Sequence, residues 1–456
     1  MTPLTQSSAE AYVASTCFKI GPPGQVGVEL EWFVHDSCRP HAAPDPDRVN
    51  AALDSLRLSP DLPLLPHGSR LTREPGGQVE LSSPAADDLA GCVDITSQDL
   101  GILRAAFAAQ DLTLVGYGTE PHPRERRVTL RQPRYLAMEE FFGRTGPWGK
   151  IMMCTTASTQ VCLDAGTDGP SASGPSTDGP GGTSTGGPRA DGAWHDFRAR
   201  WELAHRLGPV LVAAFANSPL LDGRPTGYRS TRQAVWSRMD PSRTLAPTAV
   251  DGDPRAAWAR YVLDAAVLCV RRPEGHPWSA PVGLTFRDWL AGPEAERPSL
   301  ADLDYHMTTL FPPVRPRGYL ELRMIDAQPG DGWQVPAALA AALFADPKAA
   351  DAALAALEPL AAATAEPGPR GPAWTRAATR GMDDPVLRRA ALGCFTAAEQ
   401  VLADQARAGR PGAGRLRSAV AEFAERYPAR GRCPADDLLE APTAPRRPAP
   451  EEDAPC

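Results

Sequence analysis

The feature of this chain that most constrains its fold is a set of four short segments in which apolar and polar residues alternate. The segments are residues 26–34 (VGVELEWFV), 77–81 (GQVEL), 158–164 (STQVCLD) and 319–325 (YLELRMI). Successive side chains of a strand point to opposite faces, so each segment would form a strand with one apolar and one polar face. Such strands are typical of an antiparallel sheet that packs on a core with one face only. We therefore predict an antiparallel sheet whose polar face lines a cleft free of helices.

Helical periodicity occupies several of the intervals between these strands and most of the C-terminal third. The segments with this periodicity are residues 194–216, 255–270, 335–363 and 385–426. Alanine, the strongest helix former, is abundant in the last two. Because proline lacks an amide hydrogen, we expect Pro209 and Pro359 to end or interrupt their helices. Strands and helices together predict an α+β fold, with helices around the sheet and a helical C-terminal third.

Two segments differ from the rest in composition. Residues 166–192 consist almost wholly of Gly, Pro, Ser, Thr and Asp, and residues 441–456 are rich in Pro and Glu. Neither segment has enough apolar surface to offset the entropy of ordering, so we expect a disordered surface insertion and a disordered tail. The chain then divides into a catalytic core (1–335), a helical part packed on the core (336–440) and the tail (441–456).

The net charge and the cysteine content limit which classes of molecule this 456-residue chain can bind and in which compartment it works. The net charge of −8 argues against a nucleic acid, because phosphate binding needs a basic face. No apolar run reaches the roughly 18 residues of a membrane span, and the polar N-terminus does not have the pattern of a secretory signal. The nine cysteines are scattered without a CxxC pair, as is typical of reduced thiols. We expect a cytoplasmic protein that acts on small molecules; the oligomeric state is left open.

Five glutamates lie on the polar faces of three predicted strands or in a turn before one of them. They are Glu29, Glu31, Glu74, Glu80 and Glu321. Glu29 and Glu31 would project from one face about 7 Å apart, and a solvated sheet face would explain that pair alone. Five carboxylates on one face repel each other without a cation, and hard oxygen donors suit Mg²⁺ or Mn²⁺, particularly when substrate phosphates complete the shell. We predict a metal site of the kind that holds ATP for phosphoryl transfer.

Arginines supply the complementary charge. Residues 226–243 contain four of them around Trp236, namely Arg229, Arg232, Arg238 and Arg243. Guanidinium groups bind carboxylates and phosphates in a bidentate manner, although a solvated basic loop is the alternative. Arg323 follows Glu321 on the same face, where it would pair with a carboxylate or meet a transferred phosphoryl group. ATP would not bind through a Walker loop, because residues 143–151 (GRTGPWGKI) have the wrong spacing.

Taken in order, these segments resemble the glutamate–cysteine ligases, in particular the actinobacterial type that makes γ-glutamylcysteine for ergothioneine. The matching segments are residues 27–31 (GVELE), 74–82 (EPGGQVELS), 153–161 (MCTTASTQV), 215–219 (FANSP), 229–243 and 318–323 (GYLELR). The resemblance implies a curved antiparallel sheet that forms a funnel, as in the catalytic domain of glutamine synthetase. It also implies that ATP phosphorylates L-glutamate to a γ-glutamyl phosphate, which the amine of L-cysteine then attacks.

The resemblance implies roles for individual residues. The five glutamates would bind two or three Mg²⁺ ions, and Arg323 would be catalytic, stabilising the transferring phosphoryl group. Arg232 and Trp236 match positions that hold the glutamate substrate. Gln160 falls where some relatives place a metal-binding histidine and others a glutamine, and we group it with the substrate-binding residues.

Two alternatives to this ligase stay open. A carboxylate–amine ligase would activate glutamate in the same way but join it to a different amine, and the acceptor pocket carries no motif that distinguishes the two. A non-catalytic nucleotide- or metal-binding relative is the other alternative. The complete acidic set together with Arg323 argues against it.

Overall fold

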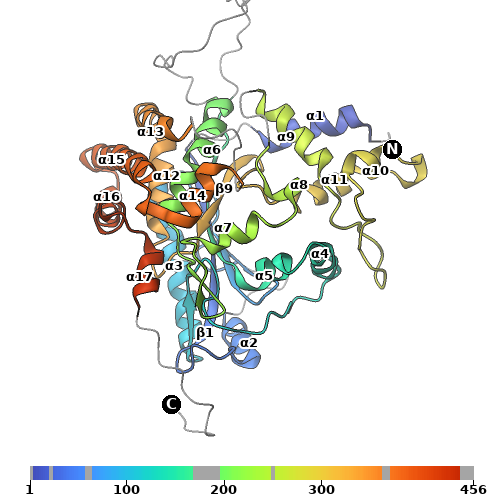
Figure 1. Ribbon diagram of the computed structural model, residues 1–456, viewed down its shortest axis with the longest axis horizontal. Helices are drawn as coiled ribbons and strands as arrows, with labels where there is room; N and C mark the ends of the chain where they lie inside the picture. The colour runs from blue at the N-terminus through green and yellow to red at the C-terminus, as the bar shows by residue number, and fades with distance from the viewer. Residues whose placement is uncertain are drawn as a thin grey trace, which may run out of the picture.

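A seven-stranded antiparallel sheet forms the centre of the molecule (Figure 1). The computed structural model describes residues 4–19, 24–56, 64–167, 196–247, 252–361 and 370–441. Along the sheet the strands follow the order β2 (Arg70–Arg73), β3 (Val79–Ser82), β1 (Val26–Asp36), β5 (Ser158–Asp164), β9 (Tyr319–Asp326) and β8 (Val314–Pro316), and β4 (Leu112–Val115) pairs with the end of β1. A separate hairpin joins β6 (Leu220–Leu221) and β7 (Arg224–Pro225). The predicted α+β class and the four predicted strands are confirmed, whereas β2, β4 and β8 were not anticipated.

The register of the sheet brings its charged residues together. Glu31 on β1 lies opposite Glu80 on β3, and Glu29 lies opposite Gln160 on β5. On the other side of β5, Cys162 lies opposite Glu321 on β9. Because side chains alternate between faces with a period of two, this register gathers the glutamates on one face.

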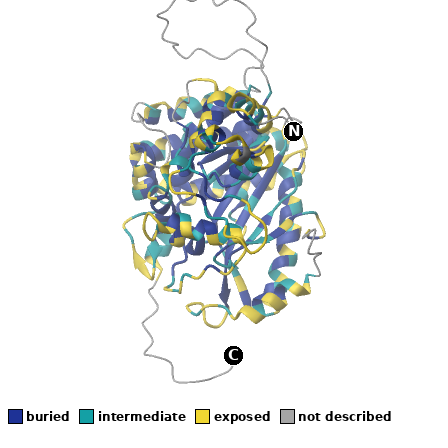
Figure 2. Cartoon of the chain, turned by 90° about the vertical axis from the view of Figure 1, so that its right-hand side faces the viewer, coloured by how far each residue is buried: buried dark blue, intermediate teal, exposed yellow. Residues whose placement is uncertain are grey.

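The opposite face of the sheet packs on the hydrophobic core. Val28, Leu30 and Trp32 of β1 are buried there. Three helices contact this region of the sheet: α3 (Leu89–Ala108), α6 (Phe197–Ala214) and α12 (Gln334–Ala345). Figure 2 shows the strands as buried ribbons enclosed by helices whose outer surfaces are exposed. The expectation of one apolar face on a core is therefore confirmed.

The charged face is covered too, which corrects the expectation of a cleft free of helices. Side chains of α4 (Pro133–Gly143), α5 (Trp148–Thr155) and α7 (Thr231–Trp236) line a cavity above this face. Sequence patterning missed the contact because these short helices are held there by long-range packing, in a second hydrophobic cluster that includes Met138, Met153 and Val235.

The remaining helices lie around these layers. They are α1 (Gln6–Cys17), α2 (Pro46–Ser55), α8 (Pro241–Thr244), α9 (Pro254–Asp264), α10 (Phe286–Ala291) and α11 (Leu300–Met307), with 3-10 turns at Glu294–Glu296, Gly381–Asp383 and Pro428–Arg430. Helix α9 is shorter than predicted, because Ala266 and Cys269 leave it and form antiparallel bridges with Thr285 and Ser279.

The C-terminal third is helical, as predicted, but its breaks differ from those expected. The helices after α12 are α13 (Pro347–Ala361), α14 (Pro372–Arg380), α15 (Pro385–Arg407), α16 (Ala413–Arg426) and α17 (Pro434–Glu440), and α13, α14 and α15 contact α6 (Figure 1). Pro209 and Pro359 lie inside helices. The break falls instead at Asp346, whose side chain accepts a hydrogen bond from the Ala349 amide at 2.9 Å, followed by Pro347. An aspartate cap before a proline is a helix start, where proline is tolerated.

The structure bears only in part on the expectations about the insertion, the tail and the cysteines. The insertion predicted at 166–192 and the tail at 441–456 lie almost entirely outside the described residues. Seven described cysteines are free thiols, as expected, but Cys38 is disulfide-bonded. Among the described helices, none has the length and apolar character needed to span a membrane.

Candidate active site

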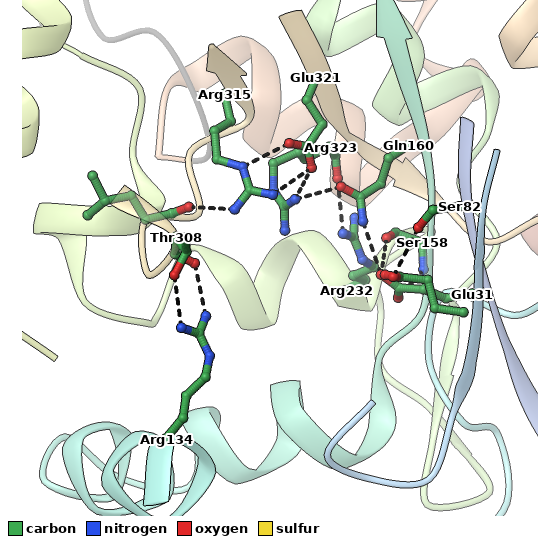
Figure 3. A network of polar contacts seen from close by, with 12 residues as sticks. Glu31, Ser82, Arg134, Ser158, Gln160, Arg232, Thr308, Arg315, Glu321 and Arg323 are labelled. Carbon is green, nitrogen blue, oxygen red and sulfur yellow. Dashed lines mark hydrogen bonds and ion pairs between the residues drawn. The ribbon is translucent and has the colours of Figure 1, made fainter. Parts of the chain in front are cut away.

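Glu31 lies in the middle of β1 and is held by the neighbouring strand β5. Its Oε2 accepts a hydrogen bond from the backbone amide of Ser158 at 2.8 Å. Its Oε1 accepts hydrogen bonds from Ser158 Oγ at 2.9 Å and from Gln160 Nε2 at 3.1 Å (Figure 3). Burial raises the pKa of Glu31, although Arg232 and Ser158 oppose that effect. These contacts fix the orientation of a carboxylate that faces other carboxylates.

Glu74 precedes β3 in a tight turn that is pressed against α5. Gly77 in this turn has a φ of +93°, and a Cβ on Gly76 would lie 2.4 Å from the Cα of Cys154, so both positions require glycine. The carboxylate of Glu74 accepts no hydrogen bond from the part of the chain that the structure describes. Burial, followed by the charges of Glu80 and Glu31, raises the pKa of Glu74 well above its usual value.

Two further glutamates crowd the same face. Glu80 accepts hydrogen bonds from Thr72 Oγ1 at 2.8 Å and Ser82 Oγ at 3.2 Å. Burial and the charge of Glu31 raise the pKa of Glu80. Burial, Glu321 and Glu80 raise the pKa of Glu29 to about 7. Each of these carboxylates therefore raises the proton affinity of another, which indicates a site with too few positive charges of its own.

Glu321, by contrast, is fully paired with arginines. Arg315 on the edge strand β8 donates from Nε to Glu321 Oε2 at 2.8 Å and from Nη2 to Oε1 at 2.9 Å. Arg323 donates from Nη1 to Glu321 Oε1 and, at 2.6 Å, to Gln160 Oε1 (Figure 3). Burial alone would raise the pKa of Glu321, but the two arginines lower it to about 2.

Arg232 on α7 approaches the sheet from the opposite side of the cavity. It is buried, and its Nη2 donates to the backbone carbonyl oxygen of Arg323 at 3.0 Å. Its guanidinium carbon lies 5.7 Å from the centre of the Trp236 ring. Nε and Nη1 of Arg232 have no hydrogen-bond partner among the described residues, so two donors are left for a ligand.

A cavity of about 80 Å³ joins these elements. Five residues singled out from the sequence line it: Glu31, Glu74, Arg232, Trp236 and Arg323. Four other predicted site residues lie on the same sheet but do not line the cavity, namely Glu29, Glu80, Gln160 and Glu321. A larger cavity of about 370 Å³ between α3, α12 and the α15–α16 connection contains none of the predicted site residues.

Sequence reasoning missed several residues of this site. Gln78, Ser158 and Phe311 line the cavity, and Gln78 Oε1 is buried without a hydrogen-bond partner in the described part of the chain. Gln78 and Ser158 were on the predicted polar faces, so their alternation with apolar residues was a usable signal. The sequence signal for Arg315 was weaker, because Arg315 lies in a strand of only three residues, Val314–Pro316, just before the turn at Gly318.

The four predicted arginines of residues 226–243 separate in the structure. Only Arg232 reaches the cavity. Arg229 pairs with Asp436 at 2.7 Å, and Arg243 is buried and pairs with Asp240 at 2.9 Å. Arg238 is exposed and lies 4.7 Å from the Trp148 ring. Three of the four therefore make local contacts outside this cavity.

The donor set fits a hard divalent cation at four of its five glutamates. Glu29, Glu31, Glu74 and Glu80 supply oxygen ligands whose mutual repulsion a cation would relieve. Glu321 could join them only if its arginines turned away. Within the described ranges no three His, Cys, Asp or Glu side chains stand in metal-binding geometry, so a cation would have to draw these carboxylates together.

Comparison with known proteins finds a matching family model and several similar proteins. The chain matches the family model for glutamate-cysteine ligase family 2 (GCS2) over residues 25–177 and 186–453. It is 40% identical over 410 residues to the glutamate–cysteine ligase EgtA of Mycolicibacterium smegmatis, covering 87% of this chain and 86% of that protein. It is 38% identical over 445 residues to EgtA of Mycobacterium tuberculosis, covering 96% and 90%.

More distant relatives extend the comparison. The chloroplastic glutamate–cysteine ligase of Medicago truncatula is 28% identical over 347 residues, covering 72% of this chain and 62% of that protein. Among solved structures, the glutamate–cysteine ligase of Francisella tularensis in complex with AMP is 11% identical with a TM-score of 0.48, covering 92% and 85%.

Proposed function

Because the chain belongs to glutamate-cysteine ligase family 2, we propose that it joins L-glutamate to the amine of L-cysteine in an ATP-dependent reaction. The products are γ-glutamylcysteine, ADP and phosphate. The observation that carries this function is the meeting of Arg323 and Arg232 over Glu31 at one cavity. Two guanidinium groups beside an acidic cluster suit a reaction in which a carboxylate receives a phosphoryl group.

The reaction proceeds in two displacements. A γ-carboxylate oxygen of glutamate attacks the γ-phosphorus of ATP, and the bond to the bridging oxygen breaks to release ADP. The cysteine amine then attacks the γ-carbonyl of γ-glutamyl phosphate, loses a proton and expels phosphate. Neither step needs a side-chain nucleophile.

The residues of the chain have distinct parts in this scheme. Arg323 places positive charge where the phosphoryl group transfers, the electrostatic contribution that most lowers such barriers. Arg232 binds a carboxylate of glutamate through its unpaired Nε and Nη1. Trp236, beside it, covers the substrate and excludes water. Gln160 couples the two sides of the site, because it donates to Glu31 and accepts from Arg323.

Metal ions belong to the same proposal. Glu29, Glu31, Glu74 and Glu80 would hold two or three Mg²⁺ ions, for which Mn²⁺ would substitute, while Glu321 stays paired with Arg315 and Arg323. Bound there, the cations would neutralise the phosphates of ATP and polarise its γ-phosphoryl group. The raised pKa values of the first four glutamates support a cation at this place.

Organisation and cellular role complete the proposal. Residues 1–335 form the ligase core and residues 336–440 pack on it, which the contacts of α13, α14 and α15 with α6 support. The product serves ergothioneine synthesis in the cytoplasm. The EgtA proteins at 38–40% identity support that assignment.

The test is ADP release from the purified protein with ATP, glutamate and one amino acid at a time, with products identified by mass. We expect release that requires both glutamate and cysteine, stops when Mg²⁺ is omitted and returns with Mn²⁺. Release with another amine would keep the mechanism and change the substrate. Absence of release from folded protein would favour the non-catalytic alternative.

A further inference from the structure

Arg315 lies on the edge strand β8, away from the cavity, and yet it connects to the centre of the site. We propose that Arg315 is a positioning residue for phosphoryl transfer, which holds Glu321 so that Glu321 fixes the guanidinium of Arg323. The proposal rests on the proposed function of the same site. It concerns a residue outside the acidic set and outside the substrate-binding residues.

Glu321 occupies two of the donor nitrogens of the planar Arg315 guanidinium. Arg315 is buried, and its Nε and Nη2 donate to the two carboxylate oxygens at 2.8 and 2.9 Å. Nη1 donates to the carbonyl oxygen of Leu310 at 3.1 Å. Both side chains lie within the hairpin of β8 and β9, where Arg315 is directly opposite Glu321. Such a bidentate pair restricts the rotation of both partners, so Arg315 acts through Glu321 rather than on substrate.

Within the described residues, the guanidinium of Arg323 donates hydrogen bonds from one nitrogen only. Nη1 is the atom that contacts both Glu321 and Gln160. Nε and Nη2 donate no hydrogen bond to the described residues, and Arg323 lines both the 80 Å³ cavity and a smaller one of about 20 Å³ next to it. The anchored nitrogen therefore sets the direction in which the other two donors face the reacting group.

The hydrogen bonds continue from Arg323 across the sheet to β1. Gln160, which accepts from Arg323, donates from its Nε2 to Glu31 at 3.1 Å. Arg315 on the edge strand and Glu31 in the middle of the sheet are thus the two ends of one hydrogen-bonded chain (Figure 3). A displacement of about 1 Å at a reacting group costs up to about 100-fold in rate, so loosening Arg315 would slow the chemical step.

A competing explanation is that Arg315 only neutralises a buried carboxylate for the sake of folding. The two explanations differ for Arg315→Lys, which keeps the charge but loses the planar fork. A purely structural role would lower stability and leave the kcat of the folded enzyme unchanged. A positioning role would lower kcat while glutamate and ATP still bind, because Arg315 touches neither.

The experiment measures kcat, the KM values for glutamate and ATP, and thermal unfolding of Arg315→Lys beside the wild type. We expect kcat to fall about 10- to 100-fold, with both KM values within about threefold. The matched control is Arg200→Lys, since Arg200 is likewise buried and pairs with Asp164 at 3.0 Å but lies outside the site. That control should lose stability and keep its kcat.

Several results would overturn the proposal. A kcat within about twofold of the wild type would do so, as would a rise in KM at constant kcat. If Arg315→Lys does not fold, Arg315→Gln is measured by the same criteria, and failure of both variants to fold would assign Arg315 to the fold alone. The wild-type assay is separate: a wild type without ligase turnover contradicts the proposed function, whereas the ratio of variant to wild type tests the positioning role.

Discussion

The carboxylate of Glu31 interacts with the carboxylates of Glu74 and Glu80 as well as with Arg232, and hydrogen bonds from β5 hold it in place. The amide and hydroxyl of Ser158 and the amide of Gln160 all donate to it. A glutamine at this position would keep the shape and part of this hydrogen bonding while removing one charge from a repulsive cluster. The residue therefore matters for activity more than for folding.

We predict that Glu31→Gln loses turnover by at least about 100-fold and unfolds at the same or a higher temperature than the wild type. Mg²⁺-dependent ADP release and thermal unfolding measure the two effects. Glu358→Gln serves as the control, because Glu358 is exposed and pairs with Arg206 away from the site. Wild-type turnover in Glu31→Gln would remove Glu31 from the site.

A second prediction at this scale concerns Arg232. Because two of its donors are unpaired in the cavity, Arg232→Ala should raise the KM for glutamate about 10-fold or more, the cost of a lost charge-assisted contact. The KM for ATP should change far less. Arg238→Ala is the matched control, since Arg238 is exposed near the same helix and stacks on Trp148. An unchanged glutamate KM in Arg232→Ala would refute its substrate-binding role.

At the scale of elements, the helical C-terminal part docks on the core through close helix packing. Helix α14 contacts α6 where Gly208 faces Trp374. A Cβ on Gly208 would lie 2.3 Å from Cζ2 of that indole ring, so only glycine permits this approach. The contact makes α6 a common support of the sheet and the C-terminal helices.

Gly208→Ala should therefore destabilise the protein by about 1–3 kcal/mol, the usual cost of overpacking. Gly101→Ala in α3 is the contrasting variant, because its Cβ would meet nothing within 4 Å and removing a helical glycine gains about 0.5–1 kcal/mol. Urea unfolding followed by circular dichroism measures both. Equal stabilities would show that α6 and α14 do not pack this closely in solution.

At the scale of the whole molecule, two histidines that do not line the cavity are buried in their neutral form. His205 donates from Nδ1 to the carbonyl oxygen of Trp201, and His306 donates from Nε2 to that of Val262. The second nitrogen of each ring has no hydrogen-bond partner among the described residues. Burial lowers the pKa of His205 to about 4 and that of His306 to about 3.

These shifts predict that the two histidines contribute less stability in mild acid, whereas the raised pKa values of the site glutamates act in the opposite direction. An unfolded histidine has a pKa of about 6.5, so below that pH the unfolded chain binds protons that the folded chain does not. The contribution is complete above pH 6.5 and declines as the pH falls toward 4, by up to about 1.4 kcal/mol per pH unit for each histidine. Thermal unfolding between pH 7 and pH 4.5 measures it. Relative to His205→Gln, the wild type should lose stability as the pH falls, and a constant difference in stability between the two proteins would contradict the assignment.

The sequence by itself determined the strands and the acidic face. Alternation with a period of two is a local property, so β1, β5 and β9 and the shared face of Glu29 and Glu31 follow from residue order alone. The resemblance to a ligase family likewise rested on motifs that are contiguous along the chain, and the family match bears it out.

Only the tertiary structure decided which side chains meet at the site. Of four neighbouring arginines only Arg232 reaches the cavity, because it is the one that lies on α7. Arg315 joins Glu321 through a hairpin whose register depends on the Gly318 turn. The cover of α4, α5 and α7 over the charged face depends on packing between segments distant in sequence. Patterns along a chain report the faces of single elements, whereas a site depends on how different elements approach each other.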